Sequence, residues 1–264
     1  MKLAGSVCIV TGSATGVGAA CAVMLAGKGA RVVVNYSRSE REARETMVAC
    51  MAAGTEALLV QGDVANDADC HRIADAALEC WGRVDGLVNN AGVTKFANPA
   101  DLDLLEAADF HRLLDVNVIG AFQMIRAVVP AMRAQGQGAI VNVSSNATAI
   151  GGGSSLAYTA SKGALNSLTL AFARSQGPDI RVNAVCPGII DTRWMRNAVG
   201  VENYPALERR VSESTPLGRV ATPDDVASAV VWLAEGADFV TGELLTVDGG
   251  LHRLLPNAKP QSRA

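Results

Sequence analysis

The sequence predicts an α/β protein in which a doubly wound parallel sheet of seven strands carries helices on both faces. Short β-branched runs alternate with longer Ala-rich segments along the chain, which is the pattern of repeated strand–helix units. Most of the short runs are almost continuously apolar, as expected of strands buried on both faces of a parallel sheet. No change of composition marks a linker, so a single domain is expected.

The elements follow one another in a regular order. Residues 18–29 and 223–236 repeat apolar side chains at the spacing of a helix, and each follows or precedes a strand candidate. The strand candidates are residues 6–11, 31–35, 57–61, 86–90, 139–144, 180–186 and 244–248.

Two helix starts can be predicted from capping chemistry. Ser39 and Glu42 have the Ser-x-x-Glu spacing of a capping box. Thr222 is followed by Pro223 and Asp225, which gives an N-cap, a proline at the first helical position and an acid at the third.

Composition argues against several classes of protein. The 264 residues are 49% hydrophobic with a net charge of −3, and no Lys/Arg-rich run suggests a nucleic-acid surface. No stretch approaches the roughly 20 apolar residues of a membrane span, and the apolar run after Met1 is interpreted as a buried first strand, not a signal peptide. We therefore expect a cytoplasmic protein with no membrane or nucleic-acid partner.

Cysteines and histidines give no sign of a disulfide framework or a metal site. The six cysteines form no CxxC pair, so reduced thiols in the core or on helices are expected. The three histidines are far apart in the chain and belong to no HxxxH pair, so no metal is predicted.

A glycine-rich loop directly follows the first predicted strand. Gly12, Gly16 and Gly18 form a GxxxGxG spacing that opens an apolar helix. Such glycines let a pyrophosphate approach the backbone, and the helix start offers free N–H groups. The alternative is a tight turn with close helix packing, but the position after the first strand favours a dinucleotide cofactor.

The end of the second strand bears on the choice of nucleotide. An acidic residue that would hold the adenosine ribose is missing there, and Tyr36, Ser37 and Arg38 occupy the place. Arg38 could pair with a 2′-phosphate and Ser37 could donate to it, so NADP(H) is predicted, with NAD(H) possible. Against this, Arg38 could be a solvated surface arginine, and Thr15 stands where a basic residue would strengthen the prediction.

Two further strand ends carry candidate cofactor contacts. Asp63 could accept from the adenine amino group or could act as a turn or N-cap aspartate. The Asn-Asn-Ala-Gly run at residues 89–92 could offer its backbone to the cofactor ribose or simply end the strand.

The strongest signal is a serine, a tyrosine and a lysine at fixed spacing. Tyr158 and Lys162 are four apart on one predicted helix and so share a face. An ammonium near a phenol stabilises the phenolate and lowers its pKa. Ser145 lies at the end of the fifth strand, where ligand-facing groups collect in parallel sheets. Each element alone could be an exposed pair or a turn, but together they indicate proton transfer to a carbonyl beside a nicotinamide.

With these motifs in place, the chain resembles the short-chain dehydrogenase/reductase family from residue 5 to about residue 251. The matching segments are TGSATGVG, GDV, NNAG, the Asn of LLDVNVIGAF, SS, YTASK, PGIIDT and VTGELLTVDGG. The nearest general type is that of 3-oxoacyl-carrier-protein reductases and related sugar, polyol and ketone reductases. The resemblance implies a Rossmann-type fold over residues 1–253 and leaves residues 254–264 as a loosely ordered tail.

The resemblance implies a catalytic tetrad. Tyr158 would be the general acid or base, Ser145 would polarise the carbonyl, Lys162 would bind the nicotinamide ribose, and Asn117 would hold a water behind it. Taken alone, Asn117 is better explained as a helix-interior residue bonded to backbone. Ser144 is a weaker candidate, because its spacing to Tyr158 is off by one.

The resemblance also implies a set of cofactor-binding residues. By this resemblance, Ile190 and Thr192 would bind the carboxamide of the nicotinamide ring. The full set is Gly12, Ser13, Thr15, Gly16, Val17, Gly18, Ser37, Arg38, Asp63, Val64, Asn90, Ala91, Gly92, Tyr158, Lys162, Pro187, Gly188, Ile190 and Thr192.

A mobile substrate cover is expected at about residues 190–215. The side chains that could line the pocket, or could equally pack the cover onto the body, are Trp194, Met195, Tyr204, Phe96, Asn146 and Thr148. Four arginines of the cover could meet an anionic substrate, although a solvated helix face explains them as well: Arg193, Arg196, Arg209 and Arg210.

The predicted function is an NADP(H)-dependent oxidoreductase that interconverts a ketone and a secondary alcohol, similar to 3-oxoacyl-thioester reductases. The alternative is an NAD-linked sugar or polyol dehydrogenase of the same family. A nucleotide-sensing protein without catalysis has no need of the tetrad. The family usually forms tetramers, so a homotetramer or a dimer is expected.

Overall fold

The computed structural model describes residues 1–253, and seven parallel strands in that range form one sheet in the order β3-β2-β1-β4-β5-β6-β7. This confirms the predicted α/β fold. The strands are β1 (Val7–Val10), β2 (Arg31–Tyr36), β3 (Ala57–Gln61), β4 (Gly86–Asn89), β5 (Gly138–Val143), β6 (Ile180–Pro187) and β7 (Leu244–Val247). Residues 254–264, the predicted tail, lie outside the described residues.

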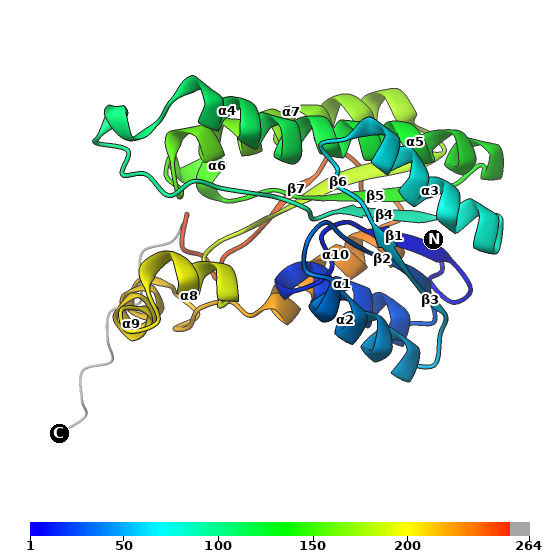
Figure 1. Ribbon diagram of the computed structural model, residues 1–264, viewed down its shortest axis with the longest axis horizontal. Coiled ribbons are helices and arrows are strands. Elements are labelled where there is room, and N and C mark those ends of the chain that lie inside the picture. The colour runs from blue at the N-terminus through cyan, green and yellow to red at the C-terminus, as the bar shows by residue number, and fades with distance from the viewer. Residues whose placement is uncertain (254–264) are drawn as a thin grey trace.

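Helices cover both faces of the sheet, as Figure 1 shows. One face carries α1 (Gly16–Gly27), α2 (Glu40–Ala52) and α10 (Pro223–Glu235). The other carries α3 (Asp67–Trp81), α4 (Ala107–Leu114), α5 (Gly120–Gln135), α6 (Ala147–Ile150) and α7 (Leu156–Gln176).

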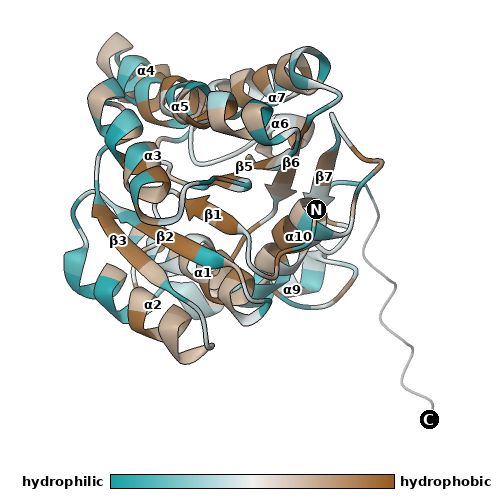
Figure 2. Cartoon of the chain, turned by 90° about the vertical axis from the view of Figure 1, so that its right-hand side faces the viewer, coloured by the Kyte–Doolittle hydropathy of each residue, from teal (hydrophilic) through white to brown (hydrophobic). Residues whose placement is uncertain are grey.

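Two hydrophobic cores fill the space between the sheet and these helices. Successive side chains of a strand point to opposite faces. In β1, Val7 and Ile9 accordingly belong to the core under α3 and α5, and Cys8 and Val10 belong to the core over α1 and α10. Figure 2 shows the same pattern, with brown strands between helices that carry teal segments on their outer sides. This two-sided burial explains why the strands read as continuous apolar runs.

The strand order reverses at β1, which pairs with β2 on one side and β4 on the other. In open parallel sheets, ligands bind outside the carboxyl ends of the strands at such a reversal. Near these ends lie the short helices α8 (Arg193–Val199) and α9 (Tyr204–Ser214), which sit together at one end of the molecule (Figure 1).

The two capping predictions have opposite outcomes. At α10, the Thr222 hydroxyl accepts from the Asp225 N–H, and the Asp225 carboxylate accepts from the Thr222 N–H, so the capping box is confirmed. At α2, the Ser39 side chain makes no cap bond, and the Glu42 carboxylate accepts from Arg193 instead. Ser39 is the N-cap of α2, so the predicted helix start is confirmed, but the capping box itself is wrong, and the Glu42 carboxylate pairs with Arg193, a residue distant in sequence.

Helix α4 continues through the π-helical segment η2 (Asp115–Ile119) into α5, and the 3₁₀ turn η1 (Leu102–Leu104) precedes it. By length and composition alone, residues 107–135 could cross a membrane, with a mean hydropathy of 1.4 in the most apolar window. Half of that window is buried inside the protein, which is the pattern of a core helix. The sequence expectation that no stretch approaches a span was thus too strong.

Candidate active site

A cavity of about 1130 Å³ opens at the carboxyl ends of the strands. Six strands are each followed by a residue that lines it, which is why residues far apart in sequence meet there. These residues are Gly12 after β1, Ser37 after β2, Gly62 after β3, Asn90 after β4, Ser144 after β5 and Gly188 after β6.

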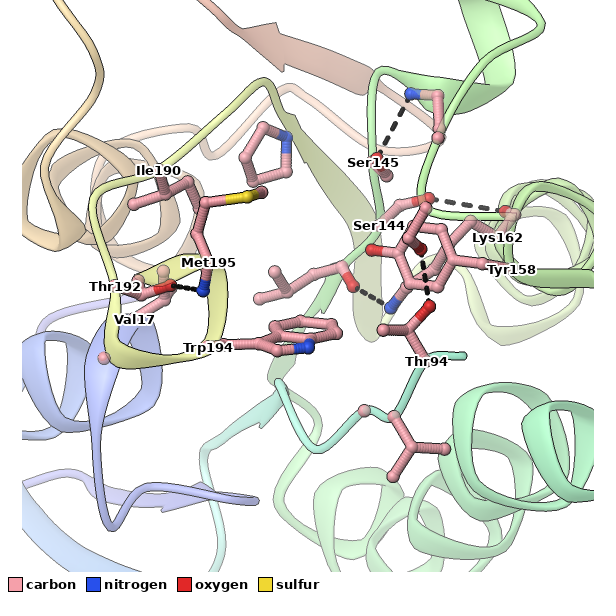
Figure 3. A pocket seen from close by; sticks show the side chains of 18 of the residues that line it. Val17, Thr94, Ser144, Ser145, Tyr158, Lys162, Ile190, Thr192, Trp194 and Met195 are labelled. Atoms are coloured by element: carbon pink, nitrogen blue, oxygen red, sulfur yellow. Dashed lines mark hydrogen bonds between the residues drawn. The ribbon is translucent and has the colours of Figure 1, made fainter. Parts of the chain in front are cut away.

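Tyr158 and Lys162 lie one turn apart at the start of α7 and face this cavity (Figure 3). Ser155 caps the helix by accepting from the Tyr158 N–H at 3.1 Å. The Lys162 side chain is buried, and its Nζ donates to the Val143 carbonyl at 2.8 Å. Nζ lies 5.8 Å from the centroid of the Tyr158 ring. The predicted helical pair is therefore brought together inside the cleft.

Ser145 joins this pair from the end of β5. Its hydroxyl accepts from the Ala147 N–H at 3.1 Å, and hydrogen bonding with Ser145 acts to lower the pKa of the Tyr158 phenol. The Ser144 hydroxyl instead donates to the Lys162 carbonyl at 3.3 Å. The structure thus places Ser145, and not Ser144, at the phenol, in line with the thirteen-residue spacing.

The pKa values of the pair are governed by burial. Burial raises the pKa of Tyr158 to about 12, while the hydrogen bond with Ser145 acts in the opposite direction. Burial lowers the pKa of Lys162 to about 8. We expected the Lys162 ammonium to lower the pKa of Tyr158. This expectation is wrong, because the pKa of Tyr158 is raised. Removing the phenol from water outweighs its other influences, and the Lys162 amine donates to a carbonyl instead of the phenol.

Asn117 lies in the π-helical segment and is almost fully buried. Its Nδ2 donates to the Val93 carbonyl and to the Ser161 hydroxyl, both at 3.0 Å, and its Oδ1 accepts from the Val93 N–H at 2.8 Å. The side chain therefore does bond to backbone, at the loop after β4, and Asn117 is not among the described residues that line the cavity. A Cβ at Gly92 would lie 3.4 Å from its Oδ1 and 3.7 Å from Lys162 Nζ, so both polar groups face Gly92.

The glycine loop has the shape of a phosphate cradle. Gly12 adopts a left-handed conformation with φ of 60°, and a Cβ there would lie 2.9 Å from Ala91 Cα. A Cβ at Gly18 would lie 2.5 Å from the Gly12 carbonyl. Thr15, the N-cap of α1, makes no side-chain cap bond, so the first N–H groups of a twelve-residue helix stay available at the cleft. These features fit the pyrophosphate of a dinucleotide.

Two asparagines hold this loop in place. Asn90 donates from Nδ2 to the Thr11 and Gly12 carbonyls, both at 3.0 Å. Asn35 accepts from the Gly12 N–H at 3.1 Å and donates to the Gly62 carbonyl at 3.1 Å. The side chain of Asn90 is thus used by the protein itself. Sequence reasoning missed Asn35, although a polar residue inside the apolar run VVVNY was a signal.

The end of the cleft that would hold the adenosine has fewer side chains that indicate which nucleotide binds there. Ser37, Asp63 and Val64 line it, whereas Arg38 is exposed and is not among the described lining residues. Asp63 Oδ1 accepts from the Ala65 N–H at 3.0 Å, the bond expected of a turn aspartate, and Oδ2 lies 4.0 Å from Arg112.

The cover contributes part of the expected lining. Trp194 and Met195 line the cavity, with Phe96 and Asn146 from other segments. Tyr204 is buried beneath Arg196, whose guanidinium carbon lies 4.5 Å from the ring centroid, and it is not among the described lining residues. Of the two alternatives left open for Tyr204, the structure therefore shows packing of the cover.

Thr148 is the other pocket candidate that the structure moves elsewhere. It is not among the described lining residues, and its hydroxyl donates to the Ser145 carbonyl at 3.0 Å. The same hydroxyl accepts from Asn166 Nδ2 at 3.0 Å, and Asn166 Oδ1 lies 3.9 Å from the Cys186 sulfur. This series of hydrogen bonds supports the backbone of Ser145. Sequence reasoning missed Asn166 and Cys186, because nothing in their local sequence shows that they meet.

The remaining cofactor candidates line the cleft, except for Ser13. Thr192 caps α8 by accepting from the Met195 N–H at 3.4 Å. Ser13 is fully buried and donates to the Val10 carbonyl, so it supports the loop from below. The predicted residues that line the cavity beside those already described are Gly16, Val17, Ala91, Gly92, Pro187, Gly188, Ile190 and Thr192.

Comparison with known proteins accounts for this geometry. A family model described as enoyl-(acyl carrier protein) reductase matches residues 12–252. A crystal structure described as a short-chain dehydrogenase/reductase from Burkholderia xenovorans is 38% identical, with a TM-score of 0.87 over 94% of this chain and 98% of that one. The chain belongs to the short-chain dehydrogenase/reductase family.

Other members of this family share most of the chain. One relative from Streptomyces violaceoruber, named as ketoacyl reductase 2 of the granaticin polyketide synthase, is 42% identical over 94% of this chain and 96% of its own length. Another, the L-rhamnose 1-dehydrogenase (NAD(P)(+)) of a Sphingomonas species, is 37% identical over 95% of this chain and 97% of its own. The protein is therefore an oxidoreductase that uses a nicotinamide cofactor.

Proposed function

We propose that this short-chain dehydrogenase/reductase interconverts a ketone and a secondary alcohol with NADP(H), in the manner of a 3-oxoacyl-thioester reductase. The observation that carries the proposal is the contact of the Tyr158 phenol with Ser145 inside the cleft, with the buried amine of Lys162 behind the ring. A carbonyl oxygen placed between the two hydroxyls would receive a hydrogen bond from Ser145 and a proton from Tyr158.

The residues around the cleft divide the remaining work. The glycine loop and the first turn of α1 would hold the pyrophosphate, and Lys162 would bind the nicotinamide ribose. Asn117, bonded on both sides to Val93, would keep its Oδ1 directed at the space beside Gly92. When bound, the cofactor supplies or accepts the hydride.

The proton step is tested by Tyr158→Phe. Because general acid–base catalysis contributes roughly 10²–10⁴-fold, we expect turnover to fall by about that factor. Binding of NADPH, measured by fluorescence titration, should be nearly unchanged, because the ring remains. Turnover retained in this variant would refute the role given to Tyr158.

An NAD-linked sugar or polyol dehydrogenase is the second candidate. It is favoured by the exposure of Arg38 and by the named activity of the Sphingomonas relative. The ratio of kcat/KM for NADPH and NADH, measured with wild type and Arg38→Gln, separates the two. A preference for NADPH that disappears in the variant supports the first candidate, and equal efficiency with both cofactors in wild type removes the proposed preference.

A homotetramer or dimer in the cytoplasm is proposed alongside this activity. Exposed apolar side chains lie on α5 and α7 at Phe122 and Leu170, and on and after α10 at Trp232 and Phe239. Such faces are covered in oligomers more often than in monomers. The cysteines are all free thiols. Light scattering in solution gives the number of chains.

A further inference from the structure

The part of the cleft next to Tyr158 and away from the glycine loop, here called the substrate end, is mainly apolar. It is formed by the loop after β4 with η1, by α6 and the loop between α6 and α7, and by the start of α8. Its apolar side chains are Val93, Phe96, Leu104, Ile150, Trp194 and Met195.

Charged groups of the cleft lie elsewhere or are already paired. Among the described lining residues, only Asp63, Arg112, Lys162 and Arg193 carry charge. Asp63 and Arg112 lie 4.0 Å apart beyond β3, and the Lys162 amine donates to a carbonyl. Arg193 donates to the Glu42 carboxylate on α2 at 2.8 Å. An anionic substrate would meet no spare cation at the substrate end, and burying an unpaired charge is costly.

The polar side chains near the substrate end also have hydrogen-bond partners within the protein. The hydroxyls of Thr94 and Ser154 are hydrogen-bonded to each other. Asn146 Nδ2 donates to Asp248 at 3.0 Å, and Asn98 Oδ1 accepts from the Ala100 N–H at 3.1 Å. A sugar or polyol presents several hydroxyls that need partners, and leaving them unpaired in a closed site loses affinity.

Trp194 is the largest side chain of the substrate end, and Figure 3 shows its indole lying across the cleft from Tyr158. The two ring centroids are 6.2 Å apart with the planes at 80°, which is an edge contact. About half of the Trp194 surface is exposed. A flat ketone that presents its oxygen to Tyr158 would replace this contact with a contact between the indole and its own ring.

We propose that the substrate is an uncharged ketone whose carbonyl belongs to, or adjoins, a flat ring system, and that Trp194 selects it by packing against that ring. The inference rests on the proposed ketone–alcohol function and narrows its substrate class. The four arginines of the cover do not form an anion site at the cleft. Arg193 pairs with Glu42, and Arg196 pairs with Asp191 through two hydrogen bonds. Arg209 and Arg210 are exposed and are not among the described lining residues.

A matched series of ketones tests the substrate class. We expect kcat/KM with NADPH to be at least about tenfold higher for tetralone than for a ring carboxylate of tetralone or an open-chain ketone of equal carbon number. A hexose, assayed in the oxidative direction with NADP⁺ as hydride acceptor, should be a poorer substrate still. Equal or higher efficiency with the carboxylate, the hexose or a linear 3-oxoacyl thioester would overturn the inference while leaving ketone reduction in place.

Variants of the tryptophan test its role. In Trp194→Ala, kcat/KM for tetralone should fall by about tenfold and that for the open-chain ketone by less than about threefold, and Trp194→Phe should restore much of the loss. Met51→Ala, a control with similar exposure on α2 (53% against 47%), removes an apolar side chain that does not line the cleft and should change neither value. An equal fall for both ketones in Trp194→Ala would contradict ring recognition.

A binding measurement separates this inference from the proposed function. In Tyr158→Phe, tetralone should quench part of the tryptophan fluorescence in the presence of NADPH, and that part should vanish when Trp194→Phe is added. If the wild type turns over no ketone but tetralone quenches the fluorescence of Tyr158→Phe, the proposed function fails and ring recognition stands. If ketones are reduced but tetralone causes no quenching, the inference fails alone.

Discussion

The wall that carries Ser145, Tyr158 and Lys162 is held by buried hydrogen bonds, whereas the cover that faces it is held by exposed ion pairs. Lys162 is only 4% exposed and donates to the end of β5. In the cover, the Arg193 and Arg196 side chains that pair with carboxylates are 55% and 47% exposed. Breaking a buried hydrogen bond leaves an unsatisfied polar group, whereas an exposed ion pair contributes about 0–1 kcal/mol to the free energy of unfolding. We therefore expect the wall to hold its side chains in fixed positions and the cover to be able to move relative to them.

After Tyr158→Phe, the largest effect should come from removing the buried cation of the wall. In Lys162→Met we expect kcat to fall by about 10²–10³-fold and NADPH binding to weaken, because Lys162 faces both the tyrosine ring and the space beside Gly92. Lys28→Met, which removes an exposed lysine paired with Glu235, is the control. Steady-state kinetics and a melting curve for each variant distinguish lost chemistry from lost folding.

The lysine also predicts a pH dependence. Its pKa is lowered to about 8, so the charged form is lost as the pH rises through that value. Because kcat/KM reports ionisations of the free enzyme, kcat/KM should decline above about pH 8. The same decline should be absent from the residual activity of Lys162→Met. A profile that is flat from pH 7 to 10 in the wild type would count against the need for a charged Lys162.

A smaller loss should follow from cutting the support behind Ser145. Asn166→Leu removes the donor to Thr148, and with it the link from Cys186 to the serine backbone. We expect kcat to fall by about tenfold with KM little changed, since the shift affects positioning and not binding. Gln176→Leu, at the far end of the same helix, is the control and should leave kcat unchanged. A pure loss of thermal stability with normal kcat would show Asn166 to be structural only.

The same contrast explains what the sequence could predict. The spacing of Tyr158 and Lys162 is set by one helix, and Ser145 follows a strand end, so local rules place all three at the cleft edge. Asn166 and Asn35 act through partners on other elements, which a single sequence does not show. The expected capping box at Ser39 failed for that reason, because the carboxylate of Glu42 finds Arg193, 151 positions away.

The ion pair between cover and body should influence release of the cofactor modestly. Glu42→Gln removes the negative charge on α2 that pairs with Arg193, so NADPH should dissociate about two- to fivefold faster, as expected for an exposed pair. Wild type at high salt should behave similarly, because salt screens such pairs. Stopped-flow fluorescence measures the rate, with Glu45→Gln on the same helix as the control. An unchanged rate would mean that the cover does not depend on this contact.

The smallest effect on activity should come from the cap where the cover rejoins the body. Ala221 bridges to Ile190 at the base of the cover, and Thr222 then caps α10. Thr222→Ala should lower the free energy of unfolding by about 1 kcal/mol, because the Asp225 N–H loses its acceptor. Ser39→Ala should cost much less, since Ser39 makes no cap bond. Thermal unfolding of both variants measures the difference, and kcat should be the same in each, because neither side chain contacts the wall or lines the cleft.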